Sequence, residues 1–188
     1  MGRPAGTALL TGLPSSGKTT LARAVRDLVA SAGGAVEVLD GDEVRRALWP
    51  ELGLSRADRA ENLDRMGHVA IMLARHGVLA LVAAIAPYAV DRERLRTRHA
   101  AAGVDLVEIH VATPPAVCRD RDVKGLYARQ ARGELGRLTG VDAPYEEPAL
   151  PDLRIDTSGE SVGESAGRLL DLLVRCGLAA PALTPQRG

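Results

Sequence analysis

A glycine-rich stretch close to the N-terminus carries the clearest chemical signal in the sequence. Residues 12–19 read Gly-Leu-Pro-Ser-Ser-Gly-Lys-Thr and match the phosphate-binding pattern G-x-x-x-x-G-K-[ST]. In such a loop, N–H groups at the start of a helix donate to phosphate oxygens, a lysine neutralises the β- and γ-phosphates, and a hydroxyl ligates Mg²⁺. We therefore predict that Lys18 is catalytic and that Thr19 is a metal ligand. The nucleotide-binding residues predicted from this loop are Gly12, Ser15, Ser16, Gly17, Lys18, Thr19 and Thr20.

The rest of the sequence narrows the class of reaction in which a nucleotide bound at this loop could take part. Asn62 is the only asparagine, so the Asn-Lys-x-Asp guanine signature of small GTPases is absent. The apolar run 78–85 ends without an acidic residue, which argues against an ATPase of the Walker B type. A chance glycine turn is disfavoured because a strand pattern precedes the loop and a helix pattern follows it. We therefore predict a nucleotide or small-metabolite kinase that uses ATP and Mg²⁺.

Two aspartates follow the second predicted strand, in the sequence Leu-Asp-Gly-Asp at residues 39–42. The carboxyl ends of parallel strands face the ligand crevice in doubly wound sheets. Asp40 and Asp42 are therefore candidate catalytic residues. One would accept a hydrogen bond or proton from an attacking hydroxyl, and the other would orient the metal. We assign the metal role to Asp42. The alternative is an Asx-turn with a helix N-cap, and it has more weight for Asp42 than for Asp40.

A third group of polar residues opens a long predicted helix. Ser55 and Asp58 have the spacing of a capping box. Arg59 and Asn62 are three residues apart and share one helix face, where a guanidinium and an amide suit a dianionic ligand. A solvated charged face is an equally good interpretation from the residues alone.

Short apolar runs alternate with longer amphipathic segments, which is typical of a parallel sheet covered by helices. The predicted strands are 7–11, 35–39, 78–85, 105–111 and 153–155. The predicted helices are 18–32, 58–75, 91–102, 115–121 and 161–175. The predicted fold class is therefore α/β, a three-layer α/β/α P-loop NTPase fold with a mainly parallel five-stranded sheet.

Residues 123–147 break this alternation, since they are rich in Arg, Gly and Pro and have no strong period. A segment of that length inside a compact domain is more often a functional lid than an inert loop. We predict one kinase domain over residues 1–177, a lid over about 123–147, and a flexible tail over 178–188.

Composition narrows the choice of partners and compartment. The 188 residues include 24 Lys plus Arg and 24 Asp plus Glu, so the formal net charge is zero and gives no general attraction to nucleic acid or an anionic membrane. With no Phe and four other aromatic residues, platforms for base stacking are scarce. The two cysteines lack CxxC spacing, and no apolar run approaches the ~20 residues of a spanning helix. We expect a cytoplasmic protein that binds neither nucleic acid nor membrane.

Several motifs in order resemble the adenylylsulfate kinase family, whose members phosphorylate the 3′-hydroxyl of adenosine 5′-phosphosulfate. The resemblance spans about residues 8–157. Beyond the glycine-rich loop, the matching segments are 39–42 with Arg45, Asp-Arg-x-Glu-Asn at 58–62, Ile-Ala-Pro-Tyr at 85–88, Thr-Pro at 113–114, Val-Cys at 117–118, Arg-Asp at 121–122, Lys-Gly-Leu-Tyr at 124–127, Thr-Gly-Val-Asp at 139–142 and Pro-Tyr-Glu at 144–146.

The resemblance implies a role for each matching residue. The phosphosulfate end of the substrate would be held by Arg45, Arg59 and Asn62. Arg121 would pack on the ATP adenine. The alternative for Arg121 is an ordinary surface ion pair with Asp120 or Asp122. The residues implied to bind substrate are Asp40, Arg45, Leu54, Arg59, Asn62, Ile85, Ala86, Lys124 and Leu138. The resemblance also implies a homodimer and a sulfate adenylyltransferase as a partner.

Four positions depart from the usual family pattern. Leu54 and Leu138 stand where many members have Phe, so contact with the substrate adenine is apolar but unstacked. Ala86 stands where many members have Ser, which leaves direct in-line transfer as the mechanism at that position. Ala89 replaces a frequent Arg. These departures keep open the alternative of a same-fold kinase acting on another hydroxylated metabolite. A second alternative, from another class, is a non-catalytic nucleotide-binding partner of a sulfate-activating enzyme, and the intact Lys18, Thr19, Asp40 and Asp42 argue against it.

Overall fold

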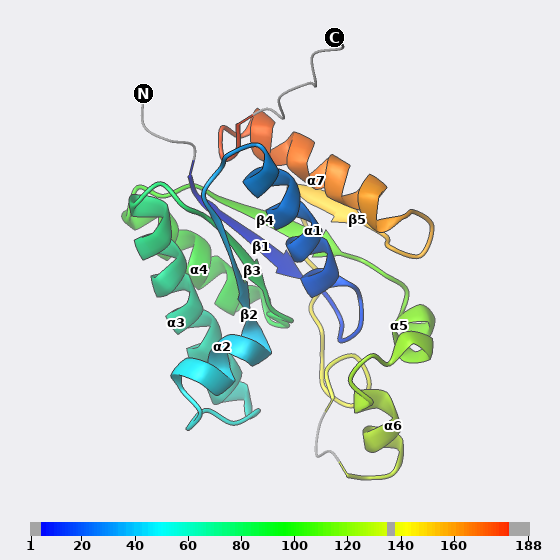
Figure 1. Cartoon of the computed structure of the whole chain (residues 1–188). Coiled ribbons are helices and arrows are strands. Elements are labelled where there is room, and N and C mark those ends of the chain that lie inside the picture. The colour runs from blue at the N-terminus through cyan, green and yellow to red at the C-terminus, as the bar shows by residue number, and fades with distance from the viewer. Residues whose placement is uncertain (1–4, 135–137, 181–188) are drawn as a thin grey trace.

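A five-stranded parallel sheet forms the centre of the molecule (Figure 1). The computed structural model describes residues 5–134 and 138–180. The strands are β1 (Thr7–Thr11), β2 (Val36–Asp40), β3 (Leu79–Ala83), β4 (Leu106–Val111) and β5 (Leu153–Ile155). Their order is β2-β3-β1-β4-β5, and every neighbouring pair is parallel. The predicted α/β fold with five strands is confirmed; β1 and β5 have the predicted bounds, and the ends of the other three strands differ by one or two residues at most.

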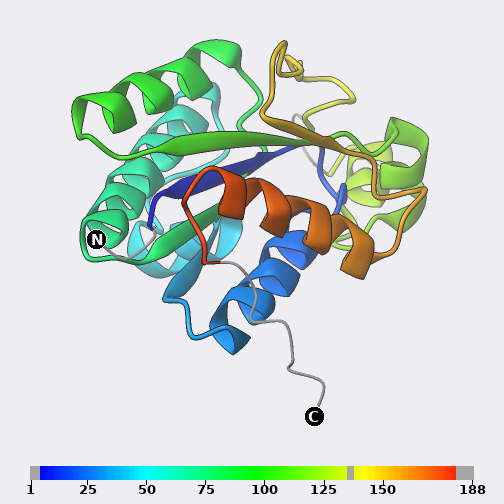
Figure 2. The same ribbon diagram turned by 90° about the horizontal axis from the view of Figure 1, so that it is seen from above.

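Helices cover both faces of the sheet. On one face lie α1 (Lys18–Ser31) and α7 (Val162–Arg175), and on the other lie α3 (Arg56–Arg75) and α4 (Ala89–Ala101) (Figure 2). Three shorter helices lie toward the carboxyl edge of the sheet: α2 (Gly41–Leu48), α5 (Pro115–Arg121) and α6 (Leu126–Ala131). Among the described residues, no helix is both long and apolar enough to cross a membrane.

The alternation of side chains along the strands explains why both faces need helices. In β1, Ala8 and Leu10 pack in the cluster that contains α1 and α7, while Leu9 packs with Met66 of α3 on the opposite face. Successive residues of a strand point to opposite sides, so a strand that is apolar at every position must be covered twice. Burying one leucine side chain contributes about 1.5–3 kcal/mol, and this core holds the strand ends in place.

Helix caps fix where the functional segments begin. Ser55 and Asp58 form the predicted capping box at the start of α3, with the Ser55 hydroxyl 3.1 Å from the Asp58 N–H. Gly17 has a φ of 100° immediately before α1, a conformation that glycine adopts without the clash of a Cβ. These caps aim the first turns of α1 and α3 at the carboxyl edge of the sheet.

Two short helices and the end of the chain differ from the sequence prediction. Neither α2 nor α6 was predicted, because α2 has eight residues, four of them charged, and α6 has only six. Leu178 and Ala179 are buried in the core, so the tail predicted from residue 178 begins too early; residues 181–188 lie outside the described part. The predicted lid contains α6, while residues 135–137 within it also lie outside the described part.

Candidate active site

The glycine-rich loop curves around the start of α1 at the end of β1. Its peptide carbonyl at Ser16 accepts hydrogen bonds from the Thr113 hydroxyl at 2.9 Å and the Thr157 hydroxyl at 3.0 Å. A Cβ at Gly12 would lie 2.4 Å from the Val111 carbonyl oxygen, so the loop can approach β4 only because this residue is glycine. The loop is therefore shaped before any phosphate binds.

Lys18 lies inside the curve of this loop. Its ammonium donates to the carbonyl oxygens of Gly12 at 2.9 Å and Leu13 at 2.6 Å, and it contacts the Ser16 hydroxyl at 3.3 Å. Burial lowers the pKa of Lys18 to about 8. A phosphate placed beside this ammonium would favour its charged form and receive a charge that is already in position.

Asp40 connects the glycine-rich loop to the acceptor side. One carboxylate oxygen accepts the Thr19 hydroxyl at 2.5 Å, and the other accepts the N–H groups of Asp42 at 3.0 Å and Glu43 at 3.2 Å. Burial raises the pKa of Asp40, but these hydrogen bonds and the charge of Lys124 outweigh burial, so the pKa lies below its ordinary value. Asp40 is thus the N-cap of α2, a structural role that was an alternative for both aspartates and had more weight for Asp42.

The oxygen atoms of Thr19 and Asp40 suit a magnesium ion. Hydroxyl and carboxylate oxygens are hard ligands, and Mg²⁺ usually keeps several waters and phosphate oxygens besides one or two protein ligands. No group of three or more His, Cys, Asp or Glu side chains in the described residues could hold a metal. Asp42, predicted as a metal ligand, lies 2.5 Å from the Lys124 ammonium.

Arg45 and Arg59 are the two cations predicted to hold the anionic end of the acceptor. Burial and then the charge of Arg45 lower the pKa of Arg59. Arg59 donates to the Leu54 carbonyl at 2.9 Å and to the Thr139 hydroxyl at 2.5 Å. The Nε of Arg45 is buried without a hydrogen-bond partner among the described residues. An anion held between them would relieve the repulsion of like charges.

Asn62 has a different environment from Arg59. It is 4% exposed, and its side-chain oxygen accepts the Trp49 indole N–H at 2.6 Å. Its amide nitrogen faces the Gly41 carbonyl at 3.4 Å. The side chain therefore joins the two ends of α2 to α3, and the structure does not place its amide on the surface that Arg59 shares with Arg45.

The loop after β3 lies between the glycine-rich loop and the segment 138–147. The Thr11 hydroxyl donates to the Ile85 carbonyl at 2.6 Å and lies 3.1 Å from the Tyr145 hydroxyl. Ala86 is buried and has a φ of 43°, in the left-handed region that residues with a Cβ rarely adopt. This loop, predicted to contact substrate, is thus held in one conformation.

The two leucines predicted to flank the substrate adenine have different environments. Leu54 is 56% exposed, whereas Leu138 is buried in a cluster with Cys118 and Tyr127, against Leu13. Leu138 therefore anchors the lid to the glycine-rich loop.

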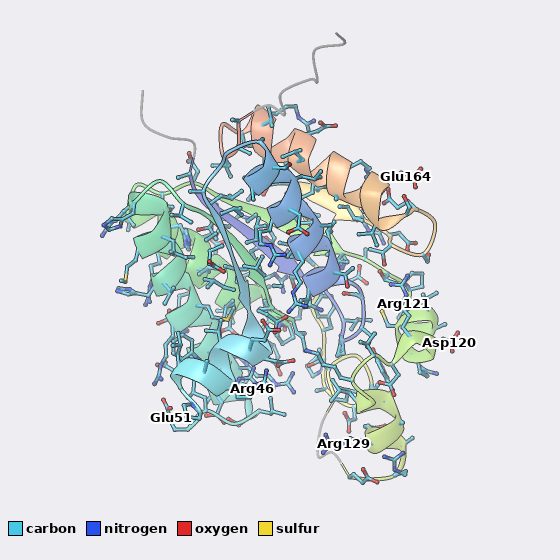
Figure 3. The ribbon with its side chains drawn as sticks, in the orientation of Figure 1. Arg46, Glu51, Asp120, Arg121, Arg129 and Glu164 are labelled. Carbon is cyan, nitrogen blue, oxygen red and sulfur yellow. The ribbon has the colours of Figure 1, made fainter. Side chains whose placement is uncertain are left out.

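Arg121 lies at the end of α5 (Figure 3). It donates to the Thr157 hydroxyl at 2.7 Å and to the Thr157 carbonyl at 2.8 Å, and a Cβ at Gly17 would lie 3.8 Å from its Nη1. Among the described residues, no ion pair joins Arg121 to Asp120 or Asp122. The guanidinium therefore borders the nucleotide loop rather than forming the surface pair considered from the sequence.

Comparison with known proteins identifies the family. The family model described as adenylylsulphate kinase matches residues 5–156. The chain belongs to the adenylylsulfate kinase family. The adenylyl-sulfate kinase of Myxococcus xanthus strain DK1622 is 49% identical over 179 residues, covering 95% of this chain and 96% of that protein. The bifunctional enzyme CysN/CysC of Mycobacterium tuberculosis is 47% identical over 167 residues, which are 89% of this chain and 27% of that enzyme.

Solved structures agree with this assignment. The Mycobacterium tuberculosis APS kinase CysC in complex with AMPPNP and APS superposes with a TM-score of 0.88 at 45% identity, covering 91% of this chain and 98% of that one. The hexameric APS kinase from Thiobacillus denitrificans superposes with a TM-score of 0.71 at 35% identity, covering 94% of this chain and 30% of that one.

Three threonines of this adenylylsulfate kinase family member had received no individual role from the sequence. Thr113 and Thr157 support Ser16, and Thr139 contacts Arg59. Thr113 and Thr139 lie within segments that match the family, so these motifs could have indicated that the two threonines belong to the site. Thr157 closes the matched region after β5, and its contact with the glycine-rich loop, 141 residues away along the chain, has no local signature.

Proposed function

We propose that this chain transfers the γ-phosphate of MgATP to the 3′-hydroxyl of adenosine 5′-phosphosulfate, giving 3′-phosphoadenosine 5′-phosphosulfate. One observation carries the proposal beyond family membership: the glycine-rich loop and an acceptor-side cation meet at the start of α2. The Asp40 carboxylate accepts the Thr19 hydroxyl of the loop at 2.5 Å, and the Asp42 carboxylate lies 3.8 Å from Nη1 of Arg45. Residues 40–42 therefore join a site suited to a triphosphate to a site suited to a second anionic nucleotide.

The donor side stabilises the transferring phosphoryl group. Lys18 would neutralise the β- and γ-oxygens, and loop N–H groups would supply further donors. Thr19 and Asp40 would hold Mg²⁺, whose chemistry here is to neutralise charge on the phosphates. Arg121 would border the ATP base. The loop shape that Thr113 and Thr157 maintain supports this assignment, because preorganised donors need no rearrangement during the reaction.

The acceptor side positions the hydroxyl. Arg45 and Arg59 would hold the phosphosulfate end, and Asp40 would accept a hydrogen bond from the 3′-hydroxyl or orient the metal. Asn62 would act indirectly, because its side chain contacts Trp49 and Gly41 at the two ends of α2 and so positions that helix. Ala86 has no hydroxyl that could be phosphorylated, so direct in-line transfer between the two nucleotides is the mechanism that these residues support.

The segment 123–147 would close over both nucleotides and exclude water. Lys124 contacts Asp42 at 2.5 Å, and the Tyr127 hydroxyl donates to the Pro14 carbonyl at 3.2 Å. These contacts join the lid to the acceptor side and to the glycine-rich loop. Exclusion of water would let the 3′-hydroxyl compete with hydrolysis of ATP.

The deciding experiment measures ADP release with adenosine 5′-phosphosulfate and with adenosine 5′-phosphate as acceptors. We expect transfer to the sulfonucleotide and at least tenfold less to the phosphate analogue. Arg59→Ala should raise KM for the sulfonucleotide by about 10- to 100-fold, because a charged hydrogen bond is lost, while Arg65→Ala on the same helix should not. Near-normal turnover by Arg59→Ala would remove the acceptor assignment.

A same-fold kinase acting on another hydroxylated metabolite is the second candidate. The exposure of Leu54 and the burial of Leu138 favour it, since neither residue offers an aromatic ring to the adenine. Faster ADP release with a different hydroxylated acceptor than with adenosine 5′-phosphosulfate would establish this candidate in place of the first.

We also propose a cytoplasmic homodimer that works beside a sulfate adenylyltransferase. The free thiols Cys118 and Cys176 support a reducing compartment. The fusion of the related domain in the CysN/CysC enzyme supports a functional partner, and the hexameric relative supports self-association. Sedimentation equilibrium of the purified chain, alone and with a sulfate adenylyltransferase, tests both assemblies; a monomer in both samples would remove them.

A further inference from the structure

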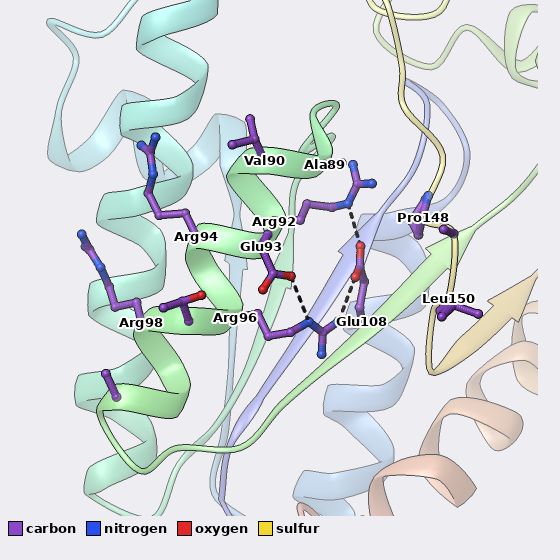
Figure 4. Close-up of a pocket in the computed structure, with 13 residues that line it drawn as sticks. Ala89, Val90, Arg92, Glu93, Arg94, Arg96, Arg98, Glu108, Pro148 and Leu150 are labelled. Carbon is purple, nitrogen blue, oxygen red and sulfur yellow. Dashed lines mark hydrogen bonds and ion pairs between the residues drawn. The ribbon is translucent and has the colours of Figure 1, made fainter.

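A buried ion pair lies directly behind the loop that follows β3. Arg92 of α4 is 5% exposed and Glu108 of β4 is 7% exposed, and the Arg92 Nε lies 2.7 Å from a Glu108 carboxylate oxygen. A groove of about 980 Å³ runs along the outer side of this pair, and Figure 4 shows Arg92 and Arg96 both reaching Glu108. The pair belongs to no nucleotide-binding motif in the sequence.

The same guanidinium also reaches the acceptor loop. The Arg92 Nη1 donates to the carbonyl oxygen of Ala86 at 2.8 Å, in a buried environment. Ala86 has the φ of 43° that is costly for any residue with a Cβ, so surrounding contacts must hold it there. Because a guanidinium is planar and rigid, the ion pair of its Nε with Glu108 restricts the positions from which Nη1 can reach Ala86.

Glu108 is itself fixed from three directions. Its second carboxylate oxygen accepts the Arg96 guanidinium at 3.0 Å, its N–H donates to the Asp152 carboxylate at 2.7 Å, and its carbonyl accepts the Asp152 N–H at 2.9 Å. A buried ion pair is weak evidence for a gain in stability, since removing two charges from water is costly. Orientation of Arg92 is therefore the better explanation for the pair.

The loop held in this way touches the acceptor side of the candidate active site. A Cβ on Gly41, the residue after Asp40, would lie 3.5 Å from the Ala83 carbonyl and 3.7 Å from the Ala84 side chain. The preceding carbonyl, that of Ile85, is held by Thr11 at the end of the donor strand. Movement of residues 84–86 would therefore displace the surface on which the acceptor is expected to lie.

We propose that Arg92 is a positioning residue for the acceptor nucleotide, acting through the Ala86 carbonyl while Glu108 holds its guanidinium in place. The proposal rests on the proposed function, because it takes the acceptor to lie against residues 85 and 86. It assigns no contact between Arg92 and either nucleotide. Its effect should therefore appear in acceptor binding and leave ATP binding unchanged.

The test compares a double variant with a matched control. Arg92→Met with Glu108→Gln removes both charges, so neither is left buried and unpaired, yet it deletes the hydrogen bond to Ala86. Arg96→Met removes a contact to Glu108 and leaves the Arg92–Ala86 bond intact. We expect the double variant to raise KM for adenosine 5′-phosphosulfate about tenfold with KM for ATP within twofold, and Arg96→Met to change neither by more than twofold.

Three outcomes would overturn the proposal: an unchanged acceptor KM in the double variant, an equal rise of both KM values, or the same acceptor defect in Arg96→Met. If the double variant does not fold, Arg92→Lys is the deciding variant, because one ammonium cannot contact both Glu108 and the Ala86 carbonyl as the guanidinium does. This variant should raise the acceptor KM about threefold. An unchanged acceptor KM would overturn the proposal. The parent protein is assayed first. A parent inactive toward adenosine 5′-phosphosulfate would refute the proposed function itself, which separates that failure from the failure of the Arg92 assignment.

Discussion

The ammonium of Lys124 lies 2.5 Å from the carboxylate of Asp42, 82 residues earlier in the chain. This ion pair joins the lid to the start of α2. Both side chains are about half exposed, so the pair alone is worth only about 0.2–1 kcal/mol, and its importance lies in the segment that it holds.

Replacing Lys124 by alanine should loosen the lid over the acceptor. We expect KM for adenosine 5′-phosphosulfate to rise about fivefold, consistent with loss of one exposed pair, and ATP hydrolysis without transfer to increase relative to the parent. Parallel assays of ADP and of phosphorylated product measure this ratio. Arg129→Ala, on α6 of the same segment (Figure 3), should leave the ratio unchanged. Equal ratios in parent and Lys124→Ala would contradict the closing role.

Removing the charge of Lys18 should act on the chemical step. We expect Lys18→Ala to lower kcat by about 10²–10³-fold, as when one preorganised donor to a developing charge is lost. Single-turnover measurements separate this effect from ATP binding. Arg26→Ala, two turns along α1 and exposed, serves as the control. A Lys18→Ala protein with kcat within a factor of three of the parent would show that the loop lysine is dispensable.

Restoring an aromatic ring at Leu54 should strengthen acceptor binding. The side chain is 56% exposed, so phenylalanine fits without repacking a core. Contact between a ring and the adenine is worth about 0.5–1.5 kcal/mol, so Leu54→Phe should lower KM for adenosine 5′-phosphosulfate by about 2- to 10-fold and leave KM for ATP unchanged. The same change at Leu138 is a poorer test, since that residue is buried in the lid cluster. An unchanged acceptor KM would place Leu54 outside the substrate site.

Gly140 tests how closely the lid packs on the glycine-rich loop. It has a φ of +84°, and a Cβ there would lie 2.4 Å from the Leu13 side chain. Gly133 has a similar φ of +73° with nothing near its Cβ position, so Gly133→Ala measures the backbone cost alone. We expect Gly140→Ala to raise KM for ATP severalfold more than Gly133→Ala does, because Leu13 must move. Equal effects in the two variants would show that lid packing at Leu13 has no influence on the nucleotide.

The buried His99 should make stability depend on pH. Burial lowers its pKa below the ordinary value of 6.5, and its ring contacts the Leu95 carbonyl and the Thr7 hydroxyl. Below about pH 6.5 the unfolded chain therefore binds more protons than the folded chain, so stability falls as pH falls. Thermal unfolding between pH 7.5 and 5 should show a falling Tm, at about 2–4 °C for each ~1 kcal/mol lost.

His99→Gln should reduce the slope of Tm against pH without abolishing it, because burial also lowers the pKa of His110. His68→Gln, at an exposed position on α3, should leave the slope unchanged. A slope in His99→Gln equal to that of the parent would mean that this imidazole does not contribute.

The sequence predicted the sheet, the long helices and the glycine-rich loop because each leaves a local pattern. β3 was predicted over 78–85 and forms over Leu79–Ala83, since an unbroken apolar run marks a strand buried on both faces. The short helix α2 was missed because its eight residues contain only Val44 and Leu48 as larger apolar side chains, too few to show a helical period. Its N-cap, Asp40, could be placed only when the helix itself was known.

The candidate site was predicted in part. Residues next to the loop and the strand ends were found, because topology dictates that these positions meet at one edge. Asn62 was assigned to the substrate although its amide pairs with Trp49, a partner 13 residues away that no spacing rule indicates. Arg92 was overlooked for the same reason, since its contacts with Glu108 and Ala86 depend on how α4 packs against the sheet.

The Thr11 hydroxyl joins three segments that are distant in sequence: the end of β1, which carries it, the Ile85 carbonyl and the Tyr145 hydroxyl. One hydroxyl oxygen therefore contacts three parts of the candidate site: the strand that leads into the glycine-rich loop, the loop of residues 84–86 next to the acceptor side, and the part of the predicted lid that contains Tyr145. Thermal displacements of these three parts should be correlated, so the distance between the two reacting atoms would vary less than the position of either nucleotide.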